Sequence, residues 1–242
     1  MTPTDFPLQK ADSEGFLLCL ETATEVCSVA IGRAGEIHSI HEIDEGYVHA
    51  SQLSVLVDQC LADASIQMQD LAAVAVSSGP GSYTGLRVGI SAAKGYCMAL
   101  DIPLIGIDTL QCLAQGARIA VGMAPSTLYC PMIDARRMEV YTALYDDQLN
   151  EVRGPYALIL DEDSFLDEIK KGQKLIFTGN GAHKFAGIFH HSAVKFINKP
   201  CSAANLVILA SERFREKNYS DVRFFTPNYL KSPHITQANK VL

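Results

Sequence analysis

The feature that most constrains the fold of this chain is an order of predicted elements that occurs twice. Two strand-like apolar stretches flank the turn "ETATE" at 21–25, a second hairpin follows through "GEIHSIHEI", and helices then alternate with short buried strands. After residue 127 the stretch "LYCPMIDARRMEVYTALY" starts the same order again. "TEVCSVAI" aligns with "MEVYTALY", and the strand before each turn ends in an acid, Glu21 or Asp134. This repetition predicts two α/β lobes, each with a mixed sheet covered by helices.

Hydrophobic periodicity predicts the elements between these hairpins. From Ala50 to Ala64, apolar residues recur at the i, i+3, i+4 and i+7 positions of an amphipathic helix. "DLAAVAVSS" is a short buried strand that runs into a glycine-rich turn, and residues 82–100 have a helical pattern. The remaining predicted elements are strands at 102–107 and 174–179 and helices at 109–120, at 164–170, from Ala182 and after the N-cap residue Ser202.

The charge balance and the cysteines limit the classes of partner and compartment. The chain has 20 Lys and Arg against 27 Asp and Glu, a formal net charge of −7. A protein that binds nucleic acid on its own presents a basic face, so we expect any RNA to be held by another subunit. The polar residues 1–14 predict a disordered lead-in, and no apolar run is long enough to span a membrane. Seven scattered cysteines without a C-x-x-C pair predict reduced thiols and a cytoplasmic protein.

The string "GPGSYTGLRVG" places Gly81, Gly85 and Gly89 four residues apart in a predicted helix. Each glycine costs about 1 kcal/mol relative to alanine in a helix interior. Because the three share one helical face, another element can approach the backbone closely there. That element is either the chain's own helix at 49–64 or a helix of another subunit.

The turn before this helix, "GPGS", has two interpretations. Its backbone N–H groups and the helix N-terminus can hold an anion, or the turn is simply tight and Ser82 caps the helix. It is not a Walker loop, because no Gly-Lys-Ser/Thr follows. Thr84 stands where G-x-G-x-x-G requires its third glycine.

The histidines offer no metal-ligand spacing. His38 and His41 lie on a predicted strand and point to opposite faces, and the adjacent His190 and His191 do not easily reach one metal. No Ser/His/Asp, Cys/His or H-E-x-x-H arrangement indicates a hydrolase. The sequence therefore predicts no catalytic residues and no metal site. The charged turn 134–137 is interpreted as a solvated turn, with a partner contact as the alternative.

Five strings make the chain resemble the TsaB (YeaZ) family of threonylcarbamoyl-adenosine formation in tRNA. They are "ETATEVCSVAI", "VAVSSGPGSYTGLRVGISAAKG", "IPLIGIDTL", "IDARRMEVY" and "PNYLK", in the family's order over nearly all of the chain after Gly15. The resemblance implies the two-lobed actin-like ATPase (ASKHA, ribonuclease H-like) fold. The lobes would cover 15–113 and 114–204, and a C-terminal helix and tail, 205–242, would return to the first lobe.

The resemblance also implies a non-catalytic paralogue of TsaD. TsaD carries a His-x-x-x-His metal pair after the strand that matches "IPLIGI", and here those positions fall at Thr109 and Leu113. In actin-like ATPases a turn such as 21–24 holds nucleotide phosphates with Asp, Gly and Thr or Ser. Here the glycine is missing and Glu replaces Asp, so the turn keeps only a residual phosphate loop, formed by Glu21, Thr22 and Thr24. We expect no resident cofactor, with weakly bound or interface-bound ATP or ADP as the alternative.

The partners implied by the family are TsaD in a heterodimer, the ATPase TsaE in a ternary complex, and a second copy of the chain in isolation. The complex transfers threonylcarbamoyl from threonylcarbamoyl-AMP to the adenosine next to the anticodon of tRNAs that read ANN codons, and only the complex would contact tRNA. The predicted partner interface lies on the helices at 49–64 and 82–100, with His49, Leu53, Val57, Gly81, Tyr83, Gly85, Arg87 and Gly89. An independent small ATPase or kinase-like enzyme and, third, a metal-dependent peptidase are the competing functions.

Overall fold

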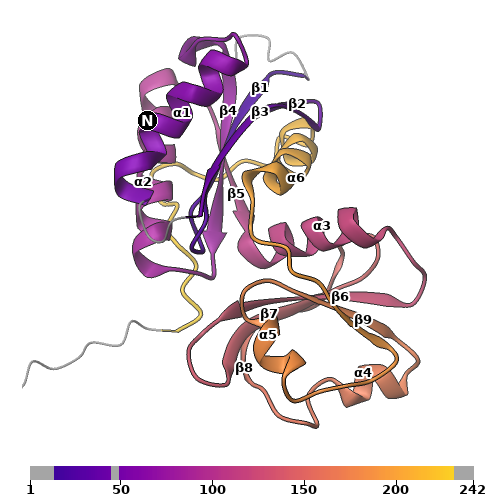
Figure 1. Ribbon diagram of the computed structural model, residues 1–242. Coiled ribbons are helices and arrows are strands. Elements are labelled where there is room, and N and C mark those ends of the chain that lie inside the picture. The colour runs from indigo at the N-terminus through magenta and orange to yellow at the C-terminus, as the bar shows by residue number, and fades with distance from the viewer. Residues whose placement is uncertain (1–13, 45–48, 232–242) are drawn as a thin grey trace, which may run out of the picture.

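The computed structural model describes residues 14–44 and 49–231, so the predicted lead-in at 1–14 lies almost wholly outside the described residues. Figure 1 shows two lobes, one above the other, each built around one sheet. In the part of the chain described, none of the helices has the length and apolar character that a membrane span requires.

The first sheet has the strand order β3-β2-β1-β4-β5. Its strands are β1 (Phe16–Glu21), β2 (Cys27–Arg33), β3 (Glu36–Ile43), β4 (Leu71–Gly79) and β5 (Leu104–Asp108). The first three strands are antiparallel neighbours, as the hairpins predict, whereas β4 and β5 continue the sheet in parallel on the other side of β1. A mixed sheet of this kind was predicted and is confirmed.

The second sheet repeats this order, because β8-β7-β6-β9-β10 has the same sequence of antiparallel and parallel neighbours. Its strands are β6 (Thr127–Asp134), β7 (Glu139–Tyr145), β8 (Glu151–Ile159), β9 (Lys174–Thr178) and β10 (Val194–Phe196). The sequence predicted neither β8 nor β10. Both are edge strands, and β8 is half-buried and contains Gly154 and Pro155, so it lacks the apolar alternation of a strand.

The predicted helices are present. They are α1 (His49–Asp63), α2 (Tyr83–Leu100), α3 (Thr109–Val121), α4 (Leu166–Lys170), α5 (Ala182–Ala186) and α6 (Ala203–Arg215), with a 3-10 turn η1 (Met68–Asp70). Side-chain oxygens satisfy backbone N–H groups at the starts of α2, α3 and α6. Asp108 caps α3 by accepting from Leu110 and Gln111, and Ser202 caps α6, as predicted.

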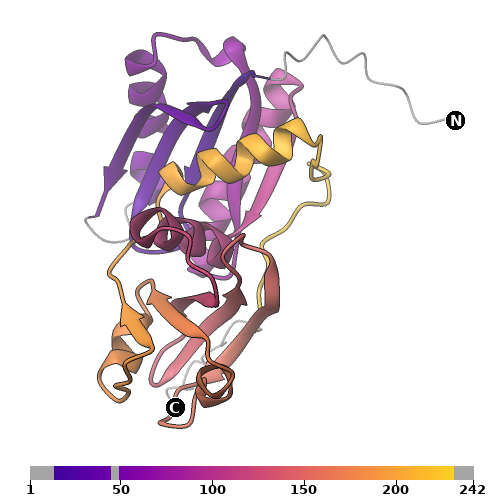
Figure 2. The ribbon, with the colours of Figure 1, turned by 90° about the vertical axis from the view of Figure 1, so that its right-hand side faces the viewer.

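Five layers result, as Figures 1 and 2 show together. The helices α1 and α2 cover one face of the first sheet, α6 and α3 lie between the sheets, and α4 and α5 cover the far face of the second sheet. Since successive strand residues face opposite sides, Leu18 of β1 packs toward α1 and α2 while Leu17 packs in the middle layer. This is the two-lobed α/β arrangement with a duplicated mixed sheet that the resemblance implied.

The chain passes between the two sheets twice. The helix α3 leads from β5 to β6, and residues 197–202 lead from β10 back to α6, which packs on β1 and β2. The predicted lobe boundaries after residues 113 and 204 fall inside α3 and α6, so that division of the chain stays a prediction. The middle layer is one continuous hydrophobic core that contains residues of both sheets, such as Ala75 and Tyr145.

Candidate functional site

The turn between β1 and β2, residues 22–26, lies against the N-terminal half of α2. The Thr22 hydroxyl donates a hydrogen bond to the backbone carbonyl of Gly85, with an O–O distance of 2.8 Å. The backbone N–H of Ser82 donates to the carbonyl of Ala23 at 2.7 Å. These contacts join the first turn of the sheet to the helix that covers it.

Gly81, just before α2, and Gly89 within it allow this close approach. A Cβ atom added at Gly89 would lie 2.2 Å from Thr22 Oγ1, and one at Gly81 would lie 2.3 Å from the carbonyl oxygen of Ala23. Real Cβ atoms do not come so close to a neighbour, so any larger residue would separate the turn from the helix. The glycine face, Gly81, Gly85 and Gly89, is therefore filled by the chain's own β1–β2 turn.

This finding corrects the interpretation of the predicted partner interface. Gly85 and Gly89 do not form an open groove, and Leu53 and Val57 of α1 are in the core against the first sheet. The predicted neighbour of the glycines was the helix at 49–64 or another subunit, whereas the observed neighbour is the β1–β2 turn, in which Thr22 lies 63 positions before Gly85.

Two predicted interface residues remain at the surface, Tyr83 and Arg87, and both contact the C-terminal tail. The Arg87 guanidinium lies 4.4 Å from the centre of the Tyr83 ring, and its Nε donates to the hydroxyl of Tyr229 at 3.3 Å. The rings of Tyr83 and Tyr229 lie 5.1 Å apart. The eighth predicted residue, His49, is the first residue of α1, and its side chain is outside the described part of the structure.

The residual phosphate loop is buried. Glu21, Thr22 and Thr24 are each less than one-tenth exposed. The Glu21 carboxylate accepts from the backbone N–H of Ala23 at 2.7 Å and from the Ser77 hydroxyl. Burial raises the pKa of Glu21, and these hydrogen bonds only partly oppose that effect. The polar groups that could meet a phosphate are thus already used inside the chain.

The "GPGS" turn acts as a helix cap. The Ser82 hydroxyl accepts from the Gly85 N–H at 3.2 Å, which confirms the capping interpretation. The tail covers the turn, since the Asn228 N–H donates to the Ser78 carbonyl at 2.6 Å. Gly79 has a φ of +108°, and a Cβ there would lie 2.6 Å from the Asn228 carbonyl oxygen, so a glycine is required on both grounds.

Asn180 connects the two lobes across this junction. Its side-chain N–H donates to the Glu25 carboxylate at 2.7 Å, and its side-chain oxygen accepts from the Asp134 N–H at 2.9 Å. Glu25 belongs to the β1–β2 turn of the first lobe, whereas in the second lobe Asp134 ends β6 and Asn180 lies in the turn after β9. Asn180 was not predicted as a functional residue, because an asparagine between two glycines indicates only a turn.

The charged turn 134–137 is exposed and is held by its own lobe. Asp134 accepts from the Lys184 ammonium at 2.6 Å and from the Arg136 N–H at 2.5 Å. Partial burial raises the pKa of Asp134, but these hydrogen bonds outweigh that effect and hold it below its usual value. The tail reaches the same region, where Lys231 pairs with Glu139. The tail therefore contacts both lobes.

The N-terminus of α3 completes the junction. Thr109 is buried, and its hydroxyl accepts from the Gly79 N–H at 3.1 Å. Leu113, one turn later, is 1% exposed and belongs to the middle core. Asp108 accepts from the Tyr145 hydroxyl at 3.4 Å, and burial raises the pKa of Asp108 to about 6.

Comparison with known proteins identifies the family. The family model described as "TsaD: tRNA N6-adenosine threonylcarbamoyltransferase" matches residues 46–238. The Bacillus subtilis protein named "tRNA threonylcarbamoyladenosine biosynthesis protein TsaB" is 29% identical over 89% of this chain and 93% of its own length. The Escherichia coli TsaB is 36% identical over 56% of this chain and 57% of its own length. The chain belongs to the TsaB (YeaZ) branch of the TsaD family.

Solved structures agree on the fold of this TsaB-family chain. A Pseudomonas aeruginosa protein described as having similarity to the peptidase YeaZ superimposes with a TM-score of 0.76. It is 24% identical, and the match covers 90% of this chain and 100% of that protein. At this identity the likeness concerns the fold alone. The matched segment spans little more than half of the length of the E. coli relative, so function rests on further argument.

The TsaB assignment bears on the role of Thr109 and Leu113. They occupy the positions that the resemblance aligns with the TsaD metal-binding histidines, and their side chains serve packing and one backbone hydrogen bond. The histidine spacing predicted no metal ligands. The fold brings a different group of polar side chains together in the interior, and histidine spacing could not reveal it: Glu21, Cys112 and Cys201. All seven cysteines are buried and free, as predicted.

Proposed function

We propose that this chain is a non-catalytic partner subunit of TsaD. It would support the transfer of threonylcarbamoyl from threonylcarbamoyl-AMP to the adenosine next to the anticodon of tRNAs that read ANN codons. The observation that carries the proposal is the burial of Thr109 and Leu113 in the chain's own packing. The resemblance aligns these two positions with the metal-binding histidines of TsaD. A chain with this fold and without those groups contributes through a partner.

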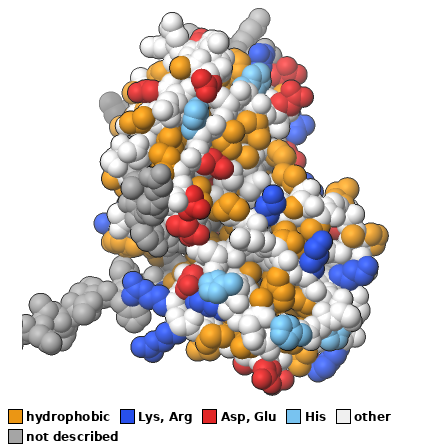
Figure 3. All heavy atoms as spheres, viewed as in Figure 1, with side chains coloured by type: hydrophobic (Ala, Val, Ile, Leu, Met, Phe, Trp, Pro, Cys, Tyr) orange, Lys and Arg blue, Asp and Glu red, His pale blue; other side chains and the backbone are white. Residues whose placement is uncertain are grey.

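Two further observations support this role. The curated relatives are named as tRNA threonylcarbamoyladenosine biosynthesis proteins. On the face shown in Figure 3, Lys and Arg side chains are scattered over the lower lobe, and acidic side chains interrupt the surface of the upper lobe. With a net charge of −7 the chain gains little from the phosphate backbone, so tRNA would be held by the complex. The site of action would be the cytoplasm, where the tRNA is.

We assign the TsaD contact to the outward face of α1 and α2. Val55 of α1 and Met98 of α2 are large apolar side chains that are 45% and 72% exposed. Small exposed residues on the same two helices would let a partner helix approach the backbone closely. They are Ser51, Ser54, Ala62, Ser91 and Ala99. The same face would serve the homodimer, and TsaE would join the heterodimer.

The test uses arginine substitutions on this face. Val55→Arg and Met98→Arg should leave the circular dichroism spectrum unchanged, since both side chains are exposed. Each should weaken binding to purified TsaD at least about tenfold, because an unpaired charge would be desolvated in the interface. The matched control is Ile159→Arg at the end of β8, a position that is 69% exposed, and β8 belongs to the lobe that does not contain α1 and α2 (Figure 1).

The readouts are light scattering for association and formation of threonylcarbamoyl-adenosine in a mixture of TsaD, TsaE, tRNA and threonylcarbamoyl-AMP. The chain alone should give no product, and the mixture should lose product with Val55→Arg but not with Ile159→Arg. Product formed by this chain without TsaD would refute the non-catalytic role. Submicromolar ATP binding by the chain alone would favour an independent ATPase instead.

A further inference from the structure

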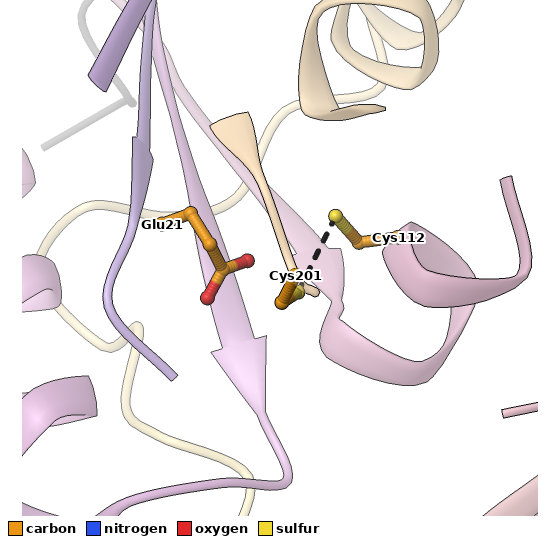
Figure 4. Close-up of side chains that lie close together, drawn as sticks. All are labelled: Glu21, Cys112 and Cys201. Carbon is orange, nitrogen blue, oxygen red and sulfur yellow. Dashed lines mark hydrogen bonds between the residues drawn. The ribbon is translucent and has the colours of Figure 1, made fainter. Parts of the chain in front are cut away.

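The two chain passages between the lobes meet at one buried cluster. Cys112 lies in the first turn of α3, on the way from the first sheet to the second. Cys201 lies just before α6, on the way back. Glu21 ends β1 of the first sheet, and Figure 4 shows its carboxylate and the two thiols directed toward one another. Nothing in the TsaB role proposed above uses this cluster.

The geometry of the cluster fits tetrahedral coordination. The Sγ atoms of Cys112 and Cys201 are 3.6 Å apart, and one carboxylate oxygen of Glu21 and both sulfurs lie within 4.8 Å of one another. Two thiolates on a tetrahedral zinc ion, with bonds of about 2.3 Å, lie about 3.8 Å apart. The two sulfur atoms therefore already stand close to this spacing, and the carboxylate oxygen lies within 4.8 Å of both.

The donor set of the cluster also points to a cation. Glu21, Cys112 and Cys201 are almost completely buried, and the Glu21 carboxylate accepts from the Ala23 N–H and the Ser77 hydroxyl. Cysteine thiolates and a carboxylate are ligand types found in zinc sites. Two sulfur ligands favour a thiophilic metal over magnesium or calcium.

We propose that Glu21, Cys112 and Cys201 form a binding site for a thiophilic divalent cation of the zinc class. The ion would replace the protons on its ligand atoms, which leave to solvent, so binding should strengthen as the pH rises. Three protein ligands leave a fourth coordination position for water. Because the ligands come from β1 and from both passages between the lobes, the bound ion would hold the lobes in one relative orientation.

The test is a cobalt titration of the full chain after treatment with a chelator and a reductant. One Co²⁺ per chain should bind and give the near-ultraviolet absorption of cobalt–thiolate bonds, and Zn²⁺ should displace it. Cys112→Ser and Cys201→Ser should each abolish the stoichiometric thiolate band, and Glu21→Gln should shift the visible cobalt bands. Cys60→Ser is the control, because the Cys60 thiol lies in α1 and donates to the Val29 carbonyl at 3.2 Å, a bond that serine can replace.

A measurement on the unsubstituted chain keeps the proposal testable if a variant does not fold. In mild denaturant, Zn²⁺ should protect Cys112 and Cys201 from alkylation at least tenfold, while Cys60 reacts at an unchanged rate. Equal alkylation of the three thiols with and without Zn²⁺ would overturn the proposal. So would a cobalt spectrum without a thiolate band, or a stable Cys112–Cys201 disulfide in protein purified from cells without oxidant.

Discussion

Substitution of Gly89 by alanine tests whether the glycine face is filled by the chain's own turn or by another subunit. The new methyl group would lie 2.2 Å from Thr22 Oγ1, so either α2 or the β1–β2 turn must move. Overpacking of this kind costs about 1–3 kcal/mol. Displacing Thr22 also weakens its hydrogen bond to the buried Gly85 carbonyl, which adds about 1 kcal/mol. The gain in helix propensity, about 1 kcal/mol, offsets part of this.

The chain provides a matched control in the same helix. Gly95 is exposed, and an added Cβ there meets no atom within 4 Å. Gly95→Ala should therefore stabilise the fold by about 0.5–1 kcal/mol. Gly89→Ala should lower the free energy of unfolding by about 1–3 kcal/mol, so the two variants should differ by at least about 3 °C in Tm for a chain of this size.

The assay is thermal unfolding followed by circular dichroism, with light scattering on the same samples. Adding Thr22→Ala removes the oxygen that the new methyl meets, so the Gly89→Ala/Thr22→Ala double variant should recover at least about 1 kcal/mol relative to additivity. If Gly89→Ala is as stable as Gly95→Ala, the turn does not fill the glycine face. Loss of self-association without loss of stability would place Gly89 in an interface and refute the reasoning.

Two further predictions concern the lobe junction. Asn180→Ala removes the hydrogen bonds to Glu25 and Asp134. It should therefore lower the free energy of unfolding by about 1–3 kcal/mol and speed amide exchange in the β1–β2 turn. The control Asn150→Ala loses a bond to Asp146 within one lobe and should leave that exchange unchanged. Burial raises the pKa of Asp108 from 3.8 to about 6. Between these two pH values the folded chain holds a proton on Asp108 that the unfolded chain releases. The free energy of unfolding should therefore fall as the pH rises from about 4 to about 6. Asp108→Asn keeps the α3 cap and should remove about 3 kcal/mol of that fall, measured by chemical denaturation at several pH values. An equal pH dependence in the variant and the unsubstituted chain would show that Asp108 does not titrate as its burial implies.

The sequence by itself determined the helices, most of the strands and the repetition of the fold. Apolar periodicity, turn residues and helix caps act between residues that are close along the chain, so α1, α2 and α6 and the strands of both hairpins could be predicted from local pattern. The strands β8 and β10 could not, because edge strands bury little apolar surface and leave little pattern.

The tertiary structure decided what the distinctive residues do. The spacing of Gly81, Gly85 and Gly89 indicated a close approach, but only the fold shows that the neighbour is the turn containing Thr22. Asn180 and the Glu21–Cys112–Cys201 cluster had no signal in the sequence, because their partners are far away along the chain. Local patterns record the face of an element that becomes buried, whereas the identity of its neighbour depends on how the two sheets and α3 pack together.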